Sequence, residues 1–140
     1  MVEAENIDYV TEVTGDILVS AFPEQLDCSL SSRALWGYCL RIENNSNKRI
    51  RLIRKNFCFT NESGKCCYDL SQGFNGEMPD VEPGEFFEYE DTAIIEGNVA
   101  VLYGSCFAVD ENGCEIEIKI PLLQLNAPNP DMLTIRFCAN

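Results

Sequence analysis

The sequence predicts an all-β protein that folds as a sandwich of about seven strands. Apolar and polar residues alternate along several runs with a period of two, which is the pattern of strands that bury one face. Clusters of Asn, Asp, Ser and Gly separate these runs, as turns do in sandwiches. No segment shows apolar residues at helical spacing between recognisable helix caps. These observations together favour two packed sheets over any helical fold.

The first runs predict strands in the amino-terminal third of the chain. Residues 7–22 (IDYVTEVTGDILVSAF) fit one long strand or two short strands broken near Gly15. Residues 23–34 (PEQLDCSLSSRA) carry a weak signal for a short helical turn. Residues 33–44 (RALWGYCLRIEN) alternate clearly, so they predict a half-buried strand. Its inward positions are Ala34, Trp36, Tyr38, Leu40 and Ile42.

The later runs predict a central strand and an alternating one, joined by a tight turn. Residues 99–109 (VAVLYGSCFAV) are apolar on both faces, as in a central strand, and Gly104 suggests a bulge. Residues 114–120 (CEIEIKI) alternate again. Residues 61–64 (NESG) and 110–113 (DENG) predict hairpin turns. We expect one domain over residues 1–125, with residues 126–140 forming an added edge strand or a loose tail.

The charge of the chain argues against nucleic-acid and membrane partners. The formal net charge is −13, and an acidic surface repels phosphodiester backbones and anionic lipid. The amino-terminal residues MVEAENIDYV lack the basic and apolar regions of a secretory signal. No run approaches the roughly 20 apolar residues of a membrane helix. We therefore expect a cytoplasmic protein.

Histidine is absent, which removes histidine acid–base chemistry, Ser-His and Cys-His dyads and histidine metal ligands. The eight cysteines include no Cys-x-x-Cys pair, so a zinc ribbon or thioredoxin-like site lacks its spacing. We expect reduced thiols that serve as small core residues, while a disulfide between Cys58 and Cys67 across a hairpin stays open. With no nucleophile elbow or phosphate-loop lysine either, we expect no enzyme and no cofactor.

The order of the motifs resembles the ApaG domain family. The resemblance runs from roughly the first strand to Leu125, and its specificity lies in the order and spacing of the motifs together. The matching segments are WGYCLRIEN (36–44), IRLIRKNFCFT (50–60), GFNGEMP (73–79), PGEFFEY (83–89), TAII (92–95), LYG (102–104), DENG (110–113) and IPLLQL (120–125).

This resemblance implies an immunoglobulin-like or fibronectin type III-like sandwich and little enzymology. Bacterial members of the family are small proteins linked to cobalt and magnesium tolerance, often encoded near a diadenosine-tetraphosphate hydrolase. Eukaryotic members are domains of F-box proteins and of a polymerase-interacting protein, where they resemble protein-interaction modules. The resemblance therefore implies a non-enzymatic module that recognises or regulates a protein partner.

Residues 71–76 (SQGFNG) stand where the family carries a Gly-x-Gly-x-x-Gly bend, with Ser71 in place of its first glycine. A Rossmann-type phosphate site needs a helix after the glycines, and residues 77–80 (EMPD) open none. A nest of backbone N–H groups for an anion remains open, although Glu77 and Asp80 would oppose a phosphate. The structural alternative is a connecting bend that needs positive φ at Gly73 or Gly76.

We expect the bend to form a partner-binding surface, with Phe74 and Met78 exposed on it. Its proposed residues are Gly73, Phe74, Asn75, Gly76, Glu77 and Met78. The alternative is a small-molecule site for a pyrophosphate-containing ligand. That site would use the bend glycines and the basic run at residues 48–55, and its cations would be Arg49, Arg51 and Arg54.

The basic run has a simpler interpretation, which we favour. An acidic neighbouring strand would neutralise it, and the candidates are Glu85, Glu88, Glu90 and Asp91. Acidic residues at the 110–115 hairpin and in the 77–82 loop do not follow the calcium-loop pattern, so no metal site is expected. The edge strands of a sandwich offer a pairing surface, through which a homodimer could form.

Overall fold

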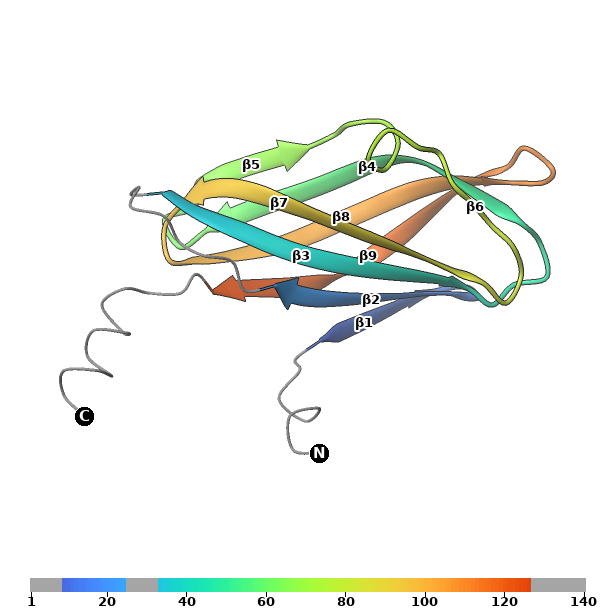
Figure 1. Ribbon diagram of the computed structural model, residues 1–140, viewed down its shortest axis with the longest axis horizontal. Coiled ribbons are helices and arrows are strands. Elements are labelled where there is room, and N and C mark those ends of the chain that lie inside the picture. Colours follow the sequence, from blue (N-terminus) through green and yellow to red (C-terminus); the bar gives the residue numbers. More distant parts are fainter. Residues whose placement is uncertain (1–8, 25–32, 127–140) are drawn as a thin grey trace, which may run out of the picture.

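The computed structural model describes residues 9–24 and 33–126, and all regular structure among them is β-strand (Figure 1). The strands are β1 (Val10–Thr14), β2 (Ile17–Glu24), β3 (Arg33–Asn44), β4 (Ile50–Asn61), β5 (Cys66–Asp69), β6 (Asp80–Val81), β7 (Phe86–Glu96), β8 (Val99–Asp110) and β9 (Glu115–Asn126). The described residues thus form nine strands where about seven were expected. The difference comes from the break at Gly15 and from the short β5 and β6.

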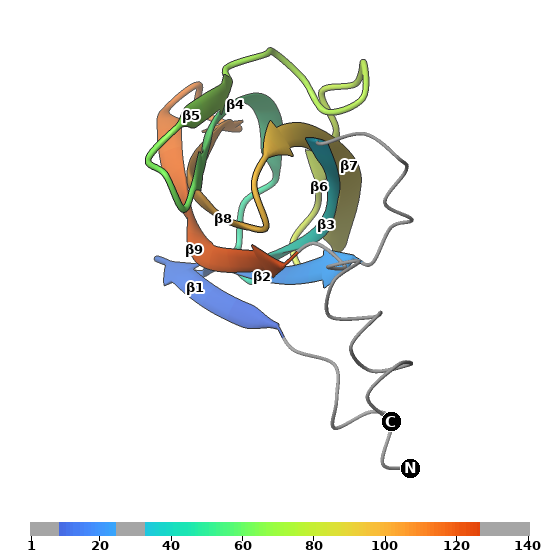
Figure 2. The ribbon, with the colours of Figure 1, turned by 90° about the vertical axis from the view of Figure 1, so that its left-hand side faces the viewer.

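The strands form two antiparallel sheets that enclose the core, as Figure 2 shows. One sheet has the order β1-β2-β3-β7, and the other has the order β5-β4-β8-β9 with β6 added beside β4. Strands β3 and β4 follow one another along the chain but lie in different sheets. The predicted immunoglobulin-like or fibronectin type III-like sandwich is confirmed.

The core follows from the alternation of side chains along each strand. Tyr38, Leu40 and Ile42 of β3 are buried, as their spacing predicts. Ile118 and Ile120 of β9 meet them from the other sheet's inner face. Each large apolar side chain buried in this way contributes about 1.5–3 kcal/mol to folding. Burial on both inner faces is what holds the two sheets together.

The bulge predicted at Gly104 is confirmed in the central strand β8, which lies between β4 and β9. The register between β8 and β9 shifts between Leu102 and Gly104. Gly104 has a φ of 135°, and a Cβ atom there would run into the carbonyl group of Asn56 on β4. Only glycine lets the two backbones approach so closely at this point.

Two asparagines organise the loops at the ends of β3 and β4. The side-chain oxygen of Asn44 accepts the N–H of Ser46 at 3.0 Å, and its amide donates to the Val81 carbonyl at 2.9 Å. Asn61 repeats the pattern, since it accepts from Ser63 at 3.0 Å and donates to the Glu96 carbonyl at 2.6 Å. The hairpin turns predicted at 61–64 and 110–113 both form.

The cysteines only partly fit their expected role as small core residues. Six lie among the described residues and all six are free, but only Cys58 and Cys106 are buried. Cys58 stands opposite Tyr68, whereas Cys67 stands opposite Phe59. Cys58 and Cys67 therefore lie on opposite faces of the sheet, and the idea that they face each other across the hairpin is wrong.

Other expectations fall outside the described residues. The short helical turn would lie almost wholly within residues 25–32, and the carboxy-terminal extension within residues 127–140. Within residues 9–24 and 33–126, no helix has the length and apolar character that a membrane span requires.

Candidate functional site

The candidate site is the bend, residues 71–78, which lies along the outer edge of β4. The N–H of Lys55 donates to the Ser71 carbonyl at 3.0 Å, and the N–H of Gly73 donates to the Ile53 carbonyl at 2.7 Å. Strand β5 precedes the bend and β6 follows it, and both pair with β4. The chain therefore pairs with the edge of β4 through β5, through residues 71–73 and through β6, and it turns away from that edge at Phe74–Glu77.

The turn itself is a miniature hairpin at Phe74–Glu77. The N–H of Phe74 donates to the Glu77 carbonyl at 2.7 Å, and the N–H of Glu77 donates back to the Phe74 carbonyl at 3.1 Å. Between them, Asn75 and Gly76 have φ values of 54° and 83°. Positive φ at both central residues is the type I′ turn, for which Asn-Gly is the preferred pair. The expected need for positive φ is confirmed at Gly76 and also at Gly73, where φ is 76°.

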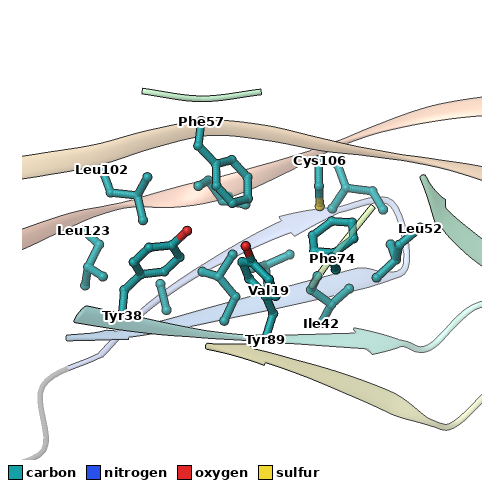
Figure 3. Close-up of a cluster of buried hydrophobic side chains, with 14 of the residues drawn as sticks. Val19, Tyr38, Ile42, Leu52, Phe57, Phe74, Tyr89, Leu102, Cys106 and Leu123 are labelled. Atoms are coloured by element: carbon teal, nitrogen blue, oxygen red, sulfur yellow. The ribbon is translucent and has the colours of Figure 1, made fainter. Parts of the chain in front are cut away.

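The expectation that Phe74 is exposed is wrong. Its side chain is 1% exposed, and its ring packs edge-to-face against Tyr89 at 5.1 Å and Phe87 at 5.9 Å. Figure 3 shows Phe74 among the core residues Cys106, Leu52 and Tyr89. Since β4 and β7 belong to different sheets, Phe74 fills the space between them. Met78, in contrast, is exposed as expected, with 47% of its surface accessible.

Lys55 anchors the bend from inside the sandwich. It is 4% exposed, its Nζ donates to the Gly73 carbonyl, and the same atom lies 4.8 Å from the ring centre of Phe74 and 5.0 Å from that of Tyr89. A buried ammonium needs such partners because burial alone disfavours charge. Sequence reasoning missed this role. The sequence did carry a sign that Lys55 is buried, because a period of two along β4 places it on the same face as Phe57 and Phe59.

The backbone N–H groups of the bend are largely used within the fold. Those of Gly73, Phe74 and Glu77 all donate to protein carbonyl groups. A nest that binds an anion needs successive N–H groups that point at the ligand. The bend therefore has the geometry of a connecting turn that closes the side of the sandwich.

The basic strand lies beside the bend, but its guanidinium groups face carboxylates. Arg51 makes two hydrogen bonds to Asp80, at 2.8 and 3.2 Å, which hold the pKa of that carboxyl below its usual value. Arg54 donates to Glu115 at 2.8 Å and lies 4.1 Å over the ring of Phe107. A bulge between Leu52 and Arg54 turns Arg54 to the outer face, against the simple alternation.

Neutralisation of the basic run was the favoured interpretation, but the acidic partners proposed for it are wrong. Strand β7, which carries most of those acids, pairs with β3 in the other sheet, and its Glu88 accepts from Arg41 at 3.4 Å. The actual partners come from β6 and β9. At Arg49 the backbone N–H donates to Glu111 at 3.1 Å.

The exposed part of the candidate site is thus smaller than the sequence suggested. At the tip of the bend it comprises Asn75, Gly76, Glu77 and Met78, while Ser71 and Gln72 are exposed at its start and the basic strand lies alongside. Phe74 and Gly73 support the tip from beneath. In the part of the chain that the structure describes, no group of three or more Cys, Asp or Glu residues is placed to hold a metal ion.

Comparison with known proteins connects this fold and bend to one family. The ApaG domain profile matches residues 24–110. The protein ApaG of Methylocella silvestris is 31% identical over 119 residues, which cover 83% of this chain and 92% of that protein. The protein ApaG of Rhizobium meliloti is 31% identical over 120 residues, with 83% of this chain and 92% of that protein covered.

A solved structure shows the same fold. The crystal structure of a putative ApaA protein from Bordetella pertussis superimposes with a TM-score of 0.75 at 24% identity, covering 81% of this chain and 95% of that one. The profile match spans the strands from β3 to β8 and includes the whole bend. The chain therefore belongs to the ApaG domain family.

Proposed function

We propose that the chain is a non-enzymatic binding module and that the tip of the bend, Asn75–Met78, contacts a protein partner. The observation that carries this proposal is an exposed methionine on a turn whose supports are buried. Phe74 and Lys55 fix the turn from the core side. A recognition element that is already ordered loses little conformational entropy on binding, which favours affinity.

The chemistry of the tip suits a protein surface better than a charged small molecule. Met78 offers a flexible apolar side chain that adapts to a partner's pocket. Glu77 beside it adds a negative charge, so a partner pocket with an apolar floor and a basic rim would be complementary. The absence of histidine from the sequence supports a binding role over acid–base catalysis.

A charge substitution at the tip tests the proposal. The Met78→Glu variant and the wild-type protein are each immobilised and exposed to a lysate, and captured proteins are identified by mass spectrometry. We expect a partner that the wild type captures and that M78E loses. The matched control is Leu122→Glu on β9, where the original side chain is 59% exposed. Equal capture by M78E and wild type would remove the bend from the interface.

A second candidate function is the binding of a pyrophosphate-containing ligand. The observation in its favour is that the basic strand lies beside the bend. Arg51 and Arg54 would have to exchange Asp80 and Glu115 for the ligand, and exposed ion pairs of this kind are worth only about 0–1 kcal/mol. Calorimetry with inorganic pyrophosphate tests it. Saturable heat that disappears in the R51A/R54A variant would support the site, whereas no heat would count against it.

A link to cobalt and magnesium homeostasis, which the resemblance suggests, stays a prediction, as does a homodimer. Sedimentation of the purified chain would give the oligomeric state directly.

A further inference from the structure

A cluster of thiols and hydroxyls lies on the outer face of the second sheet, apart from the bend. Cys58 on β4 stands opposite Tyr68 on β5 and also opposite Tyr103 on β8, so the three side chains form a row across three strands. Thr60 stands opposite Cys66 in the same way, one step along the sheet. We call these five residues the thiol cluster.

The groups of the thiol cluster lie within hydrogen-bonding distance of one another. The Sγ atom of Cys58 is 3.3 Å from the Tyr103 hydroxyl and 3.6 Å from the Thr60 hydroxyl. The Thr60 hydroxyl is in turn 3.5 Å from the Sγ atom of Cys66. The Cys58 thiol donates to the Tyr103 hydroxyl, and once that thiol has lost its proton the surrounding hydroxyl groups can donate to the sulfur instead.

These donors favour the thiolate form of Cys58. Burial acts to raise the pKa of the Cys58 thiol, but hydrogen bonds from Tyr103, Thr60, Cys66 and Tyr68 outweigh it, so the pKa lies below its usual value. The effect is mutual, because the neighbouring sulfur raises the pKa of Tyr103. A thiolate is the nucleophilic form of cysteine.

The other buried cysteine, Cys106, differs from Cys58 in its exposure and in the direction of its pKa shift. Cys106 points into the core, has no exposed surface, and burial raises its pKa to about 12. Cys58 is 6% exposed and lies at the surface beneath Tyr68 and Tyr103, which are 61% and 41% exposed. A small oxidant can reach Cys58, whereas Cys106 is enclosed by both sheets.

We propose that Cys58 is a site of reversible oxidation by hydroperoxides, with Cys66 as the second thiol of the reaction. The Cys58 thiolate attacks one peroxide oxygen, the O–O bond breaks, and a sulfenic acid forms while hydroxide leaves and takes a proton. The Cys66 thiol then attacks the sulfenic sulfur, which forms a disulfide and releases water. Each cycle reduces one peroxide and oxidises two thiols, and a small-molecule thiol restores the pair by exchange.

The register sets the order and relative speed of these two steps. Cys58 and Cys66 are diagonal neighbours, whose α-carbons lie about 7–8 Å apart in a sheet, beyond the usual 4.4–6.8 Å of a disulfide. Closing the bond requires β5 to move toward β4. Strand β5 has 4 residues and lies at the edge of its sheet, so it can shift without disturbing the core. We therefore expect the sulfenic acid to accumulate before the disulfide appears.

Mass spectrometry of the intact wild-type chain tests the proposal without any substitution. The reduced protein is treated with less than one equivalent of hydrogen peroxide, trapped with dimedone at successive times, and mapped by peptide analysis. We expect dimedone on Cys58 first and a Cys58–Cys66 disulfide later. Oxidation spread evenly over the cysteines, or occurring first at Cys67 or Cys114 with Cys58 unmodified, would overturn the proposal.

Three variants separate the roles within the thiol cluster. Cys66→Ser keeps a hydroxyl donor in place of the thiol but cannot form the disulfide, so it should prolong the life of the sulfenic acid. Cys67→Ser, on the opposite face, should change neither step. Tyr103→Phe removes one donor, so we expect oxidation of Cys58 to slow by about threefold or more at neutral pH and its pH profile to move to higher pH. An unchanged rate and profile in Y103F would contradict the role given to the hydroxyl.

Discussion

The ring of Phe74 fills the space between β4 and β7, where it packs against Phe87 and Tyr89. In strands such as β3 the period of two indicates which side chains point inward, and Tyr38, Leu40 and Ile42 all follow it. A residue in a bend follows no period, so its direction depends on which strands the folded chain brings nearby. The gap between β4 and β7 decides the place of Phe74, and the sequence carries no local sign of that gap.

Replacing Phe74 by Ala should destabilise the protein strongly. The change opens a cavity beside Tyr89 and removes the ring that faces Lys55, and such truncations cost about 3–5 kcal/mol. The matched control is Phe86→Ala, where the side chain is 49% exposed and Arg41 stacks on the ring. We expect a cost of about 1 kcal/mol or less there. Urea unfolding of both variants measures the difference, and equal losses would contradict a structural role for Phe74.

The bend is packed into the fold along β4 and also carries the exposed candidate site. The sequence predicted positive φ at its glycines and the failure of a Rossmann-type site, since both depend on local residues. It did not predict the Lys55 anchor or the ion pairs of Arg51 and Arg54, because those partners come from strands distant in the sequence. The bulge after Leu52 also moves Arg54 to the outer face of the sheet, and the alternation of apolar and polar residues does not predict this bulge.

Two glycines of the bend allow a matched test of this element. Gly73 and Gly76 have φ values of 76° and 83°, so alanine is strained at either position, by about 1–2 kcal/mol. A Cβ atom at Gly76 would meet open space, whereas at Gly73 it would lie 2.9 Å from the Glu77 carbonyl oxygen. We expect Gly73→Ala to lower the free energy of unfolding more than Gly76→Ala does. A larger loss for Gly76→Ala in urea unfolding would contradict the tight packing at Gly73.

At the scale of the whole molecule, local pattern sufficed for the fold class but not for strand pairing. The alternating runs and polar turns predicted a sandwich, and the inner faces of β3, β8 and β9 agree with it. The acidic strand proposed as a neighbour of β4 was wrong because the short loop after β3 carries the chain from one sheet to the other. Which strands pair is settled by long-range packing, and so the acids opposite the basic run could not be assigned from sequence.

The stability of the whole molecule should decline in acid because several carboxylates are held ionised. Backbone N–H groups of Asn98 and Val99 lower the pKa of Glu62 from its usual 4.5, and the Cys114 N–H lowers that of Asp110 from its usual 3.8. A folded-state pKa below the unfolded one stabilises the protein above the unfolded pKa, and this contribution is lost as the pH falls through the folded value. The Arg51–Asp80 pair acts in the same direction.

The Glu62→Gln variant isolates one of these contributions. We expect the wild type to exceed E62Q in its urea midpoint at neutral pH, and we expect that advantage to shrink as the pH falls below 4.5. Unfolding midpoints measured in steps from about pH 7 to about pH 2 give the comparison, since the relevant titrations fall in that range. A difference that stays constant over the whole range would contradict a charge effect at Glu62.

The interrupted cover along the edge of β4 also bears on how the protein behaves at high concentration. An exposed sheet edge is a template on which another chain can add a strand, and long flat edges promote aggregation. Here the outermost strands on that side are β5 and β6, of 4 and 2 residues, and the bend between them pairs with β4 at Gln72 before it turns away at Phe74–Glu77. An incoming strand finds no continuous row of N–H and C=O groups to extend along. The turn that forms the candidate site therefore also disfavours edge-to-edge association on this side of the sandwich.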